Sequence, residues 1–166
     1  SPHTGKRASA NNPATWGTLD QAISCADQYL FSGVGFMFTA ENGIIGIDID
    51  HCLENGQPNE VAADILSHLP PTFTEISPSG TGLHIFLRGN IPPGGNRNTK
   101  TGVEMYANSR YFTMTGRIHE KSSKIIAADN GEIAYIHEKY IASGRKSKKS
   151  SGYQEGNALS DDEMMS

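Results

Sequence analysis

The stretch that most constrains this chain is the apolar run IIGIDID at residues 44–50, which ends in two aspartates separated by one isoleucine. Side chains alternate between the two faces of a β-strand, so Asp48 and Asp50 are expected on one face while Ile47 and Ile49 enter a core on the other. Two carboxylates about 6–7 Å apart along a strand can hold a hard cation, and without one they repel each other. The pattern indicates either a metal site at a strand end or a strand that runs out into a solvated polar turn.

The bulk properties are those of one globular domain with tails, because 166 residues can build one core. The N-terminal SPHTGKR has no apolar segment of a signal peptide, and no run approaches the roughly 18 apolar residues of a membrane span. Two cysteines, Cys25 and Cys52, are too few for disulfides to stabilise a fold of this size, and they fit a reducing compartment. We therefore expect a cytoplasmic protein that does not bind a membrane.

The formal net charge is −4, but its sign changes along the chain. No Lys or Arg lies between Ala8 and Leu87, a stretch with nine acids, whereas basic residues outnumber acids between Arg88 and Lys124. A protein that holds cations beside a polyanion needs both signs, whereas a nonspecific nucleic-acid binder is usually basic throughout. The distribution favours the first class, with chance clustering of surface charge as the alternative.

Three segments have the periodicity of amphipathic helices. The first begins with a capping-box pattern at Thr18 and Gln21 and ends before Gly33, the second spans 60–69, and the third spans about 130–141. The apolar face expected for the first helix consists of Leu19, Ala22, Ile23, Ala26, Tyr29 and Leu30. The face expected for the last helix consists of Ile133, Ala134, His137, Tyr140 and Ile141.

Apolar and β-branched segments between the helices predict strands. Residues 34–38 and 44–49 flank Asn42-Gly43, a dipeptide typical of a tight turn, which predicts a hairpin. Further strands are predicted at 72–76, around His84, at 102–106 and at 110–116. Together these elements predict an α/β (α+β) fold, with a mainly antiparallel sheet flanked by helices.

Two polar segments lie between the later strands. The loop SPSGTG at 77–82 can bring backbone N–H groups and hydroxyls close to phosphate oxygens, but it lacks the Gly-Lys-Ser/Thr ending of a Walker A loop. Residues 90–101 predict a flexible, positively charged loop that suits a strand of nucleic acid or a triphosphate. Glu104 lies between apolar neighbours, where a charge is costly unless it is paired or bound to a metal.

Three motifs together resemble the primase-polymerase (Prim-Pol) branch of the archaeo-eukaryotic primase superfamily, found in phage and plasmid replication proteins. They are GIDIDHC at 46–52, SPSGTGLH at 77–84, and VEMY at 103–106, which runs into RYF at 110–112. The resemblance covers about residues 3–142 and implies an archaeo-eukaryotic primase-like catalytic core. Members of the family usually begin with more sheet, so we expect a core truncated at its N-terminus.

The resemblance implies template-directed nucleotidyl transfer, as a DNA primase, a DNA polymerase or both, with two Mg²⁺ or Mn²⁺ ions. The catalytic acids and metal ligands would be Asp48, Asp50 and Glu104. The nucleotide-binding residues would be His84, Ser79, Gly80, Thr81, Arg110 and Lys100.

The resemblance also implies the partners: a single-stranded DNA template and primer, nucleoside triphosphates, and a helicase domain on the C-terminal side of the parent protein. The setting would be the cytoplasm of a bacterial host. We expect residues 1–142 to form the catalytic domain, 143–159 a flexible basic linker, and 160–166 the start of a truncated following element.

Two other functions stay open on the sequence. One is a metal-dependent nuclease or nicking initiator with Tyr106 or Tyr111 as nucleophile, although the usual pair of histidines flanking one apolar residue is missing. The other is a non-catalytic DNA-binding module of a replication protein. A zinc site at His51, Cys52 and His68 is disfavoured, because four ligands at recognisable spacing are not present.

Overall fold

The computed structural model describes residues 1–31 and 33–143. The linker expected at 143–159, apart from Ser143, and the element expected at 160–166 lie outside the described residues. The helical segments are η1 (Pro13–Thr15), α1 (Leu19–Tyr29), η2 (Ala40–Asn42), α2 (Glu60–His68), α3 (Glu132–Ile136) and η3 (His137–Ile141). The strands are β1 (Val34–Phe38), β2 (Ile44–Ile49), β3 (Leu53–Glu54), β4 (Gln57–Pro58), β5 (Thr74–Ile76), β6 (Leu83–Arg88), β7 (Arg97–Asn98), β8 (Val103–Tyr106), β9 (Arg110–Met114) and β10 (Ala127–Ala128).

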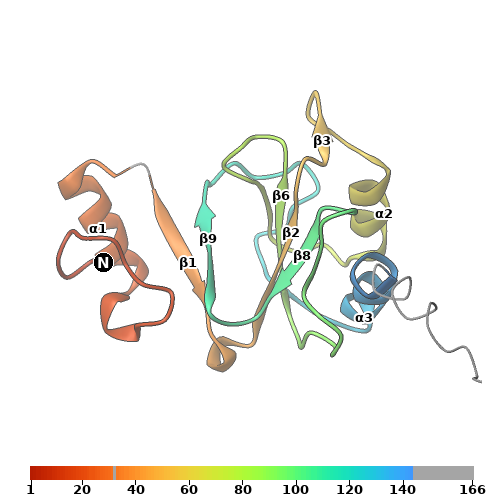
Figure 1. Cartoon of the computed structure of the whole chain (residues 1–166). Helices are drawn as coiled ribbons and strands as arrows, with labels where there is room; N and C mark the ends of the chain where they lie inside the picture. Colours follow the sequence, from red (N-terminus) through yellow and green to blue (C-terminus); the bar gives the residue numbers. More distant parts are fainter. Residues whose placement is uncertain (32, 144–166) are drawn as a thin grey trace, which may run out of the picture.

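The strand predicted from the IIGIDID run, β2, is the middle of the main sheet (Figure 1). It pairs antiparallel with β6 on one side and with β8 on the other. The other edge of β6 carries β5, antiparallel, and β10, parallel, while β7 pairs with the other edge of β8. This mainly antiparallel sheet with helices beside it confirms the predicted fold class.

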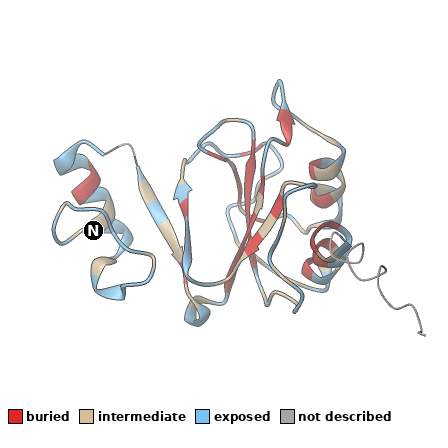
Figure 2. Cartoon of the chain, in the orientation of Figure 1, coloured by how far each residue is buried: buried red, intermediate tan, exposed pale blue. Residues whose placement is uncertain are grey.

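The two faces of the main sheet differ as the alternation of β2 predicts. Ile45, Ile47 and Ile49 are fully buried and belong to a core with residues of β6, β8, α2 and α3. In Figure 2 the buried residues of this core appear on the central strands and on the helices beside them. The opposite face carries Gly46 and Asp48, and there the two-stranded β1–β9 ribbon packs through an aromatic cluster.

The predicted hairpin between residues 34–38 and 44–49 is wrong, because β1 pairs with β9 and both edges of β2 are occupied by β6 and β8. The connection contains η2 and then Gly43, whose φ is +60°. The Asn42 side chain donates to the carbonyl of Met37 and accepts from the N–H of Ile44. The Asn-Gly signal thus marks a corner between two sheets instead of a hairpin turn.

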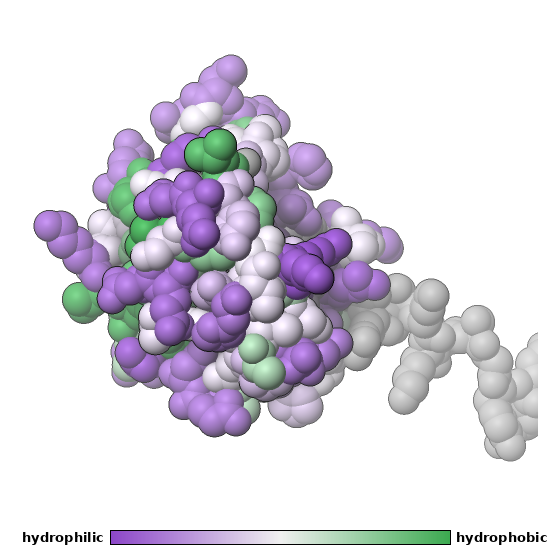
Figure 3. All heavy atoms as spheres, turned by 90° about the vertical axis from the view of Figure 1, so that its left-hand side faces the viewer, coloured by the Kyte–Doolittle hydropathy of each residue, from purple (hydrophilic) through white to green (hydrophobic). Residues whose placement is uncertain are grey.

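Helix α1 begins with the predicted capping box, in which Thr18 and Gln21 exchange side-chain and backbone hydrogen bonds. Its predicted apolar face is largely exposed, at 66% for Leu19 and 91% for Leu30. Of that face only Ala26 is buried, together with the neighbouring Cys25, because the N-terminal segment packs there, with Cys25 donating to the carbonyl of Ser1. Viewed from the α1 side, the surface shows apolar residues among hydrophilic ones (Figure 3).

The last predicted helix is confirmed as two joined pieces, α3 and the π-helix η3. Ile136 is also buried in the core, whereas Ala134, predicted to point inward, is exposed. The remaining four predicted residues of this face are buried.

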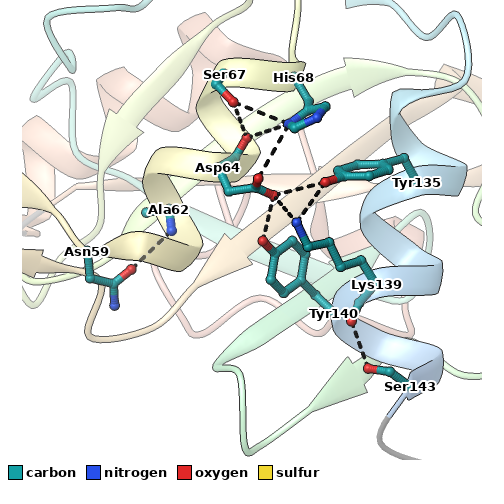
Figure 4. A network of polar contacts seen from close by, with 9 residues as sticks. All are labelled: Asn59, Ala62, Asp64, Ser67, His68, Tyr135, Lys139, Tyr140 and Ser143. Atoms are coloured by element: carbon teal, nitrogen blue, oxygen red, sulfur yellow. Dashed lines mark hydrogen bonds and ion pairs between the residues drawn. The ribbon is translucent and has the colours of Figure 1, made fainter.

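A polar cluster joins α2 to the last helix on the outer side of the core (Figure 4). One carboxylate oxygen of Asp64 accepts hydrogen bonds from Tyr140, Lys139 and Tyr135, at 2.6, 2.9 and 3.2 Å. These donors lower the pKa of Asp64 to about 2. His68 stacks on the ring of Tyr135, with centroids 4.2 Å apart. Both helices are therefore tied to each other as well as to the sheet.

The basic segment at 90–101 is only partly a loop, which corrects its prediction as one flexible excursion. Residues 97 and 98 form β7, in which Arg97 lies directly opposite Glu104 of β8 in the strand register. The carbonyl of Asn96 also accepts the N–H of Met105.

Within the described ranges, no helix is long and apolar enough to cross a membrane.

We predict that Gly46→Ala destabilises the fold, because a Cβ there would overlap the ring of Phe38 and lie 2.5 Å from Cε2 of Phe112. Overpacking of a closed core costs about 1–3 kcal/mol. Urea unfolding should show a drop of that size in the free energy of unfolding. Gly33→Ala is the matched control, since its Cβ would meet Met114 at an ordinary 3.5 Å. Equal stability of the two variants would contradict the packing described here.

Candidate active site

A row of polar residues crosses the ribbon-facing side of the main sheet, one from each of five neighbouring strands. The strand registers pair Asp48 with His84 on β6 and with Glu104 on β8. They also pair His84 with Glu75 on β5, and Glu104 with Arg97 on β7. Directly opposed residues lie on the same face, with Cβ atoms about 5 Å apart. The folded chain thus brings together two of the three predicted acids and the predicted histidine.

Asp48 occupies the middle of this row with only 17% of its side chain exposed. Its pKa is raised to about 7, first by burial and then by the negative charges of Asp50 and Glu104, against the opposing effect of Arg110. A carboxyl group in this position takes up either a proton or a cation near neutral pH. Asp50 lies just beyond the end of β2, is exposed, and continues the pairing with β8 through its N–H to the carbonyl of Gly102.

Glu104 is held by its neighbour two residues along β8, since the Tyr106 hydroxyl donates a hydrogen bond to its carboxylate. Burial, together with this hydrogen bond and the charge of Glu104, raises the pKa of Tyr106 to about 12. The guanidinium of Arg110 lies over the Tyr106 ring, 4.8 Å from its centroid. Arg110 is therefore part of the site, whereas Tyr106 is a poor nucleophile for a nicking reaction.

His84 is buried and held on two sides. Its Nδ1 lies 3.3 Å from Oε1 of Glu75, and its Nε2 lies 3.9 Å from Oδ1 of Asp48. The ring stacks on Phe112 of β9, with centroids 4.4 Å apart and planes 19° from parallel. Burial lowers the pKa of His84, although Glu75 and Asp50 act in the opposite direction. Nε2 is thus the ring nitrogen directed toward Asp48, whereas Nδ1 faces Glu75.

In the predicted phosphate loop at 77–82, hydroxyl groups are exposed and several backbone N–H groups are already hydrogen-bonded within the loop. The N–H of Gly80 bonds to the carbonyl of Ser77, and the N–H of Thr81 bonds to the Ser79 hydroxyl. The exposed hydroxyls of Ser79 and Thr81 lie 3.1 Å apart. Gly80 supplies the positive φ, +82°, that the turn requires.

Two residues that the sequence did not assign to the loop lie against it. His51 has Nδ1 3.4 Å from the Thr81 hydroxyl, and Arg117 donates through its guanidinium to the carbonyl of Ser77. Lys100, predicted in the site, lies in the turn between β7 and β8, where its N–H bonds to Asn98. Among the described residues, no hydrogen bond or ion pair joins Lys100 to the acids.

The donor set suits a hard cation, because carboxylate oxygens are the ligands that Mg²⁺ and Mn²⁺ prefer. In the described part of the chain, however, no group of three His, Cys, Asp or Glu side chains lies close enough to hold one ion. Burial raises the pKa of the Cys52 thiol to about 11, and His68 belongs to the cluster around Asp64. The acids are therefore adjacent without forming a closed cage, and nothing here favours zinc.

Comparison with known proteins agrees with the resemblance found in the motifs. The chain is 34% identical over 134 residues to a DNA primase-polymerase of Nitratiruptor phage NrS-1. The match covers 77% of this chain and 18% of the phage protein. No family model matches the chain.

We predict that the stability of the cation-free chain falls as pH rises from about 4 to about 7. The folded state keeps the proton of Asp48 up to about pH 7, whereas the unfolded chain loses it near the ordinary aspartate pKa of 3.8. The folded state thus binds more protons in this window, so one group lowers the free energy of unfolding by up to about 1.4 kcal/mol per pH unit.

Urea unfolding in a chelating buffer at several pH values measures this slope. Asp48→Asn should flatten it, and saturating Mg²⁺ or Mn²⁺ at pH 8 should stabilise the parent chain more than the variant. Equal slopes for the parent chain and Asp48→Asn would contradict the burial and charge repulsion described for Asp48.

Proposed function

This chain carries a primase-polymerase domain, and on that premise we propose that it catalyses template-directed nucleotidyl transfer, as a DNA primase, a DNA polymerase or both, in phage replication. The observation that supports the proposal is the cross-strand row in which Asp48 lies between Glu104 and His84. The 3′-hydroxyl of a primer would form a bond to the α-phosphorus of a nucleotide, and pyrophosphate would leave. The hydroxyl proton would pass to solvent.

Asp48, Asp50 and Glu104 would hold two Mg²⁺ or Mn²⁺ ions. When bound, such ions lower the pKa of the attacking hydroxyl and neutralise charge on the leaving pyrophosphate. The raised pKa of Asp48 supports this role, because a carboxylate in that position is stable only with a proton or a positive charge beside it. The hydrogen bond from Tyr106 would orient Glu104 for the same purpose.

The remaining residues of the site would bind the triphosphate. His84 directs Nε2 toward the acids, and a ring protonated on both nitrogens could donate from Nε2 to a phosphate oxygen. Ser79 and Thr81 offer hydroxyl donors at the exposed loop, while Arg110 supplies positive charge beside Glu104. We assign Gly80 to the shape of the loop and Lys100 to the periphery of the site.

The partners follow from the same reaction. They would be single-stranded DNA as template and primer, nucleoside triphosphates, and a helicase domain in the parent protein. The chain spans only 18% of the length of the phage relative, so further domains belong to this proposal. The reaction would take place in the cytoplasm of the bacterial host.

Primer extension on a labelled template, with nucleotides and Mg²⁺ or Mn²⁺, tests the proposal. We expect extension by the parent chain and a loss of at least about a hundredfold in Asp48→Ala and in Glu104→Ala, because each removes charge stabilisation from the reacting phosphates. Glu138→Gln is the matched control, since Glu138 is exposed on η3 behind the core. Cleavage of DNA without nucleotides would instead favour the nuclease, and binding without either product the non-catalytic module.

We also predict that His84→Ala weakens nucleotide binding by about 10- to 100-fold, the equivalent of one hydrogen bond to a charged group. The measurement is the apparent nucleotide affinity, with an unfolding curve recorded beside it because the ring is buried against Phe112. Unchanged affinity in a folded His84→Ala chain would remove His84 from the nucleotide site.

A further inference from the structure

Glu75 is the acid of the cross-strand row that the proposed reaction leaves without a role. It lies on β5 with no exposed surface, in the strand register directly opposite His84. A buried carboxylate is costly unless its oxygens are hydrogen-bonded. Both oxygens accept the N–H of Thr115 at 3.1 Å, Oε2 also accepts the N–H of Gly116 at 3.0 Å, and Oε1 faces Nδ1 of His84.

These contacts fix how His84 carries its proton. With three contacts from backbone N–H groups, the Glu75 carboxylate acts as an acceptor, so Nδ1 of His84 must donate to it. Nε2 is then the unprotonated nitrogen of the neutral ring, and it is the nitrogen that faces Asp48 at 3.9 Å. Stacking on Phe112 prevents the ring from tilting out of this plane.

The other two buried histidines of the described chain have the opposite arrangement. Nδ1 of His119 accepts the N–H of Lys121, and Nε2 of His137 lies 2.7 Å from the carbonyl of Gly95. An Nδ1 that accepts carries no proton, and a carbonyl only accepts, so each neutral ring carries its proton on Nε2. The Nδ1–H form of His84 is thus a specific consequence of Glu75 and not of burial in general.

We propose that Glu75 is a positioning residue, which holds Nδ1–H of His84 so that Nε2 faces the nucleotide-binding side of the sheet. The inference rests on the proposed function for what Nε2 meets there. Glu75 also couples this orientation to the segment after β9, because the same carboxylate binds the N–H groups of Thr115 and Gly116. A carboxylate behind an imidazole commonly fixes both its tautomer and its orientation.

Glu75→Gln reverses the polarity of the contact with little change in size. Its carboxamide oxygen can still accept from the backbone N–H groups, which leaves the NH₂ group facing Nδ1 of His84. The ring must then carry its proton on Nε2 or turn away. In either case the ring loses the acceptor that holds Nδ1–H, and with it the form protonated on both nitrogens that donates from Nε2. We therefore expect a three- to tenfold rise in the nucleotide KM and a smaller change in kcat.

The ¹⁵N signals of the histidine rings, recorded at pH 8 on the full chain, measure the tautomer directly. We expect His84 of the parent chain to be protonated on Nδ1, with His119 and His137 on Nε2 as internal references. Glu75→Gln should change the pattern of His84 and leave the two references unchanged. Protonation of His84 on Nε2 in the parent chain overturns the proposal, and this needs no variant to fold.

A double-mutant cycle separates positioning from a purely structural role. If Glu75 acts through His84, Glu75→Gln should change the nucleotide KM less than twofold in a His84→Ala background, with Glu138→Gln as control. An equal effect in both backgrounds overturns the proposal. A parent chain that binds no nucleotide would refute the proposed function alone, and the ¹⁵N spectrum would still decide the role of Glu75.

Discussion

The site depends on one costly placement, the Asp48 carboxylate on the middle strand of a sheet, with hydrogen-bonded neighbours on both sides. The pairing leaves Asp48 no freedom to move away from Glu104, and burial prevents water from screening the two charges. The positive charge of Arg110 on β9 offsets only part of this cost. The sheet therefore holds its acids in an arrangement that is complete only when a proton or a cation is bound.

The rest of the fold supports that placement from both faces. Ile47 and Ile49 anchor β2 in the core beneath α2 and α3, so the alternate positions must face the ribbon. On the ribbon side, Gly46 leaves the space that the rings of Phe38 and Phe112 fill. Asp48 thus lies on a strand whose other face is buried in the apolar core. The aromatic cluster covers the same face as Asp48 at Gly46, two residues earlier.

The site was predictable from the sequence as far as local periodicity reaches. The alternation of residues 44–50 placed the acids on one face, and the apolar neighbours of Glu104 indicated that its charge needs a partner. The strand pairing was not predictable, because Asn42-Gly43 indicates only a local turn. Which strands pair with β2 depends on β6 and β8, which come much later in the sequence and occupy both of its edges. Glu75 was missed for the same reason: its hydrogen-bond donors come from residues 40 and 41 positions away.

The helices show a similar limit. Capping residues correctly located the start of α1, but only Ala26 of the face that periodicity selected is buried, and the larger apolar residues of that face are exposed. In the last helix Ala134, predicted to face inward, is exposed, and Ile136 is buried although it was not predicted to be. Periodicity therefore predicts the presence of a helix more reliably than it predicts which of its side chains are buried.

The ribbon outside the main sheet also determines the surroundings of the imidazole. Phe112 covers one face of the His84 ring, and the N–H groups that hold Glu75 follow within four residues of it along the same chain. A slip of one residue in the β1–β9 register would replace Phe112 with Thr113 or Tyr111 and withdraw those donors. Strand alignment in a peripheral element thus controls side-chain chemistry at the centre of the molecule.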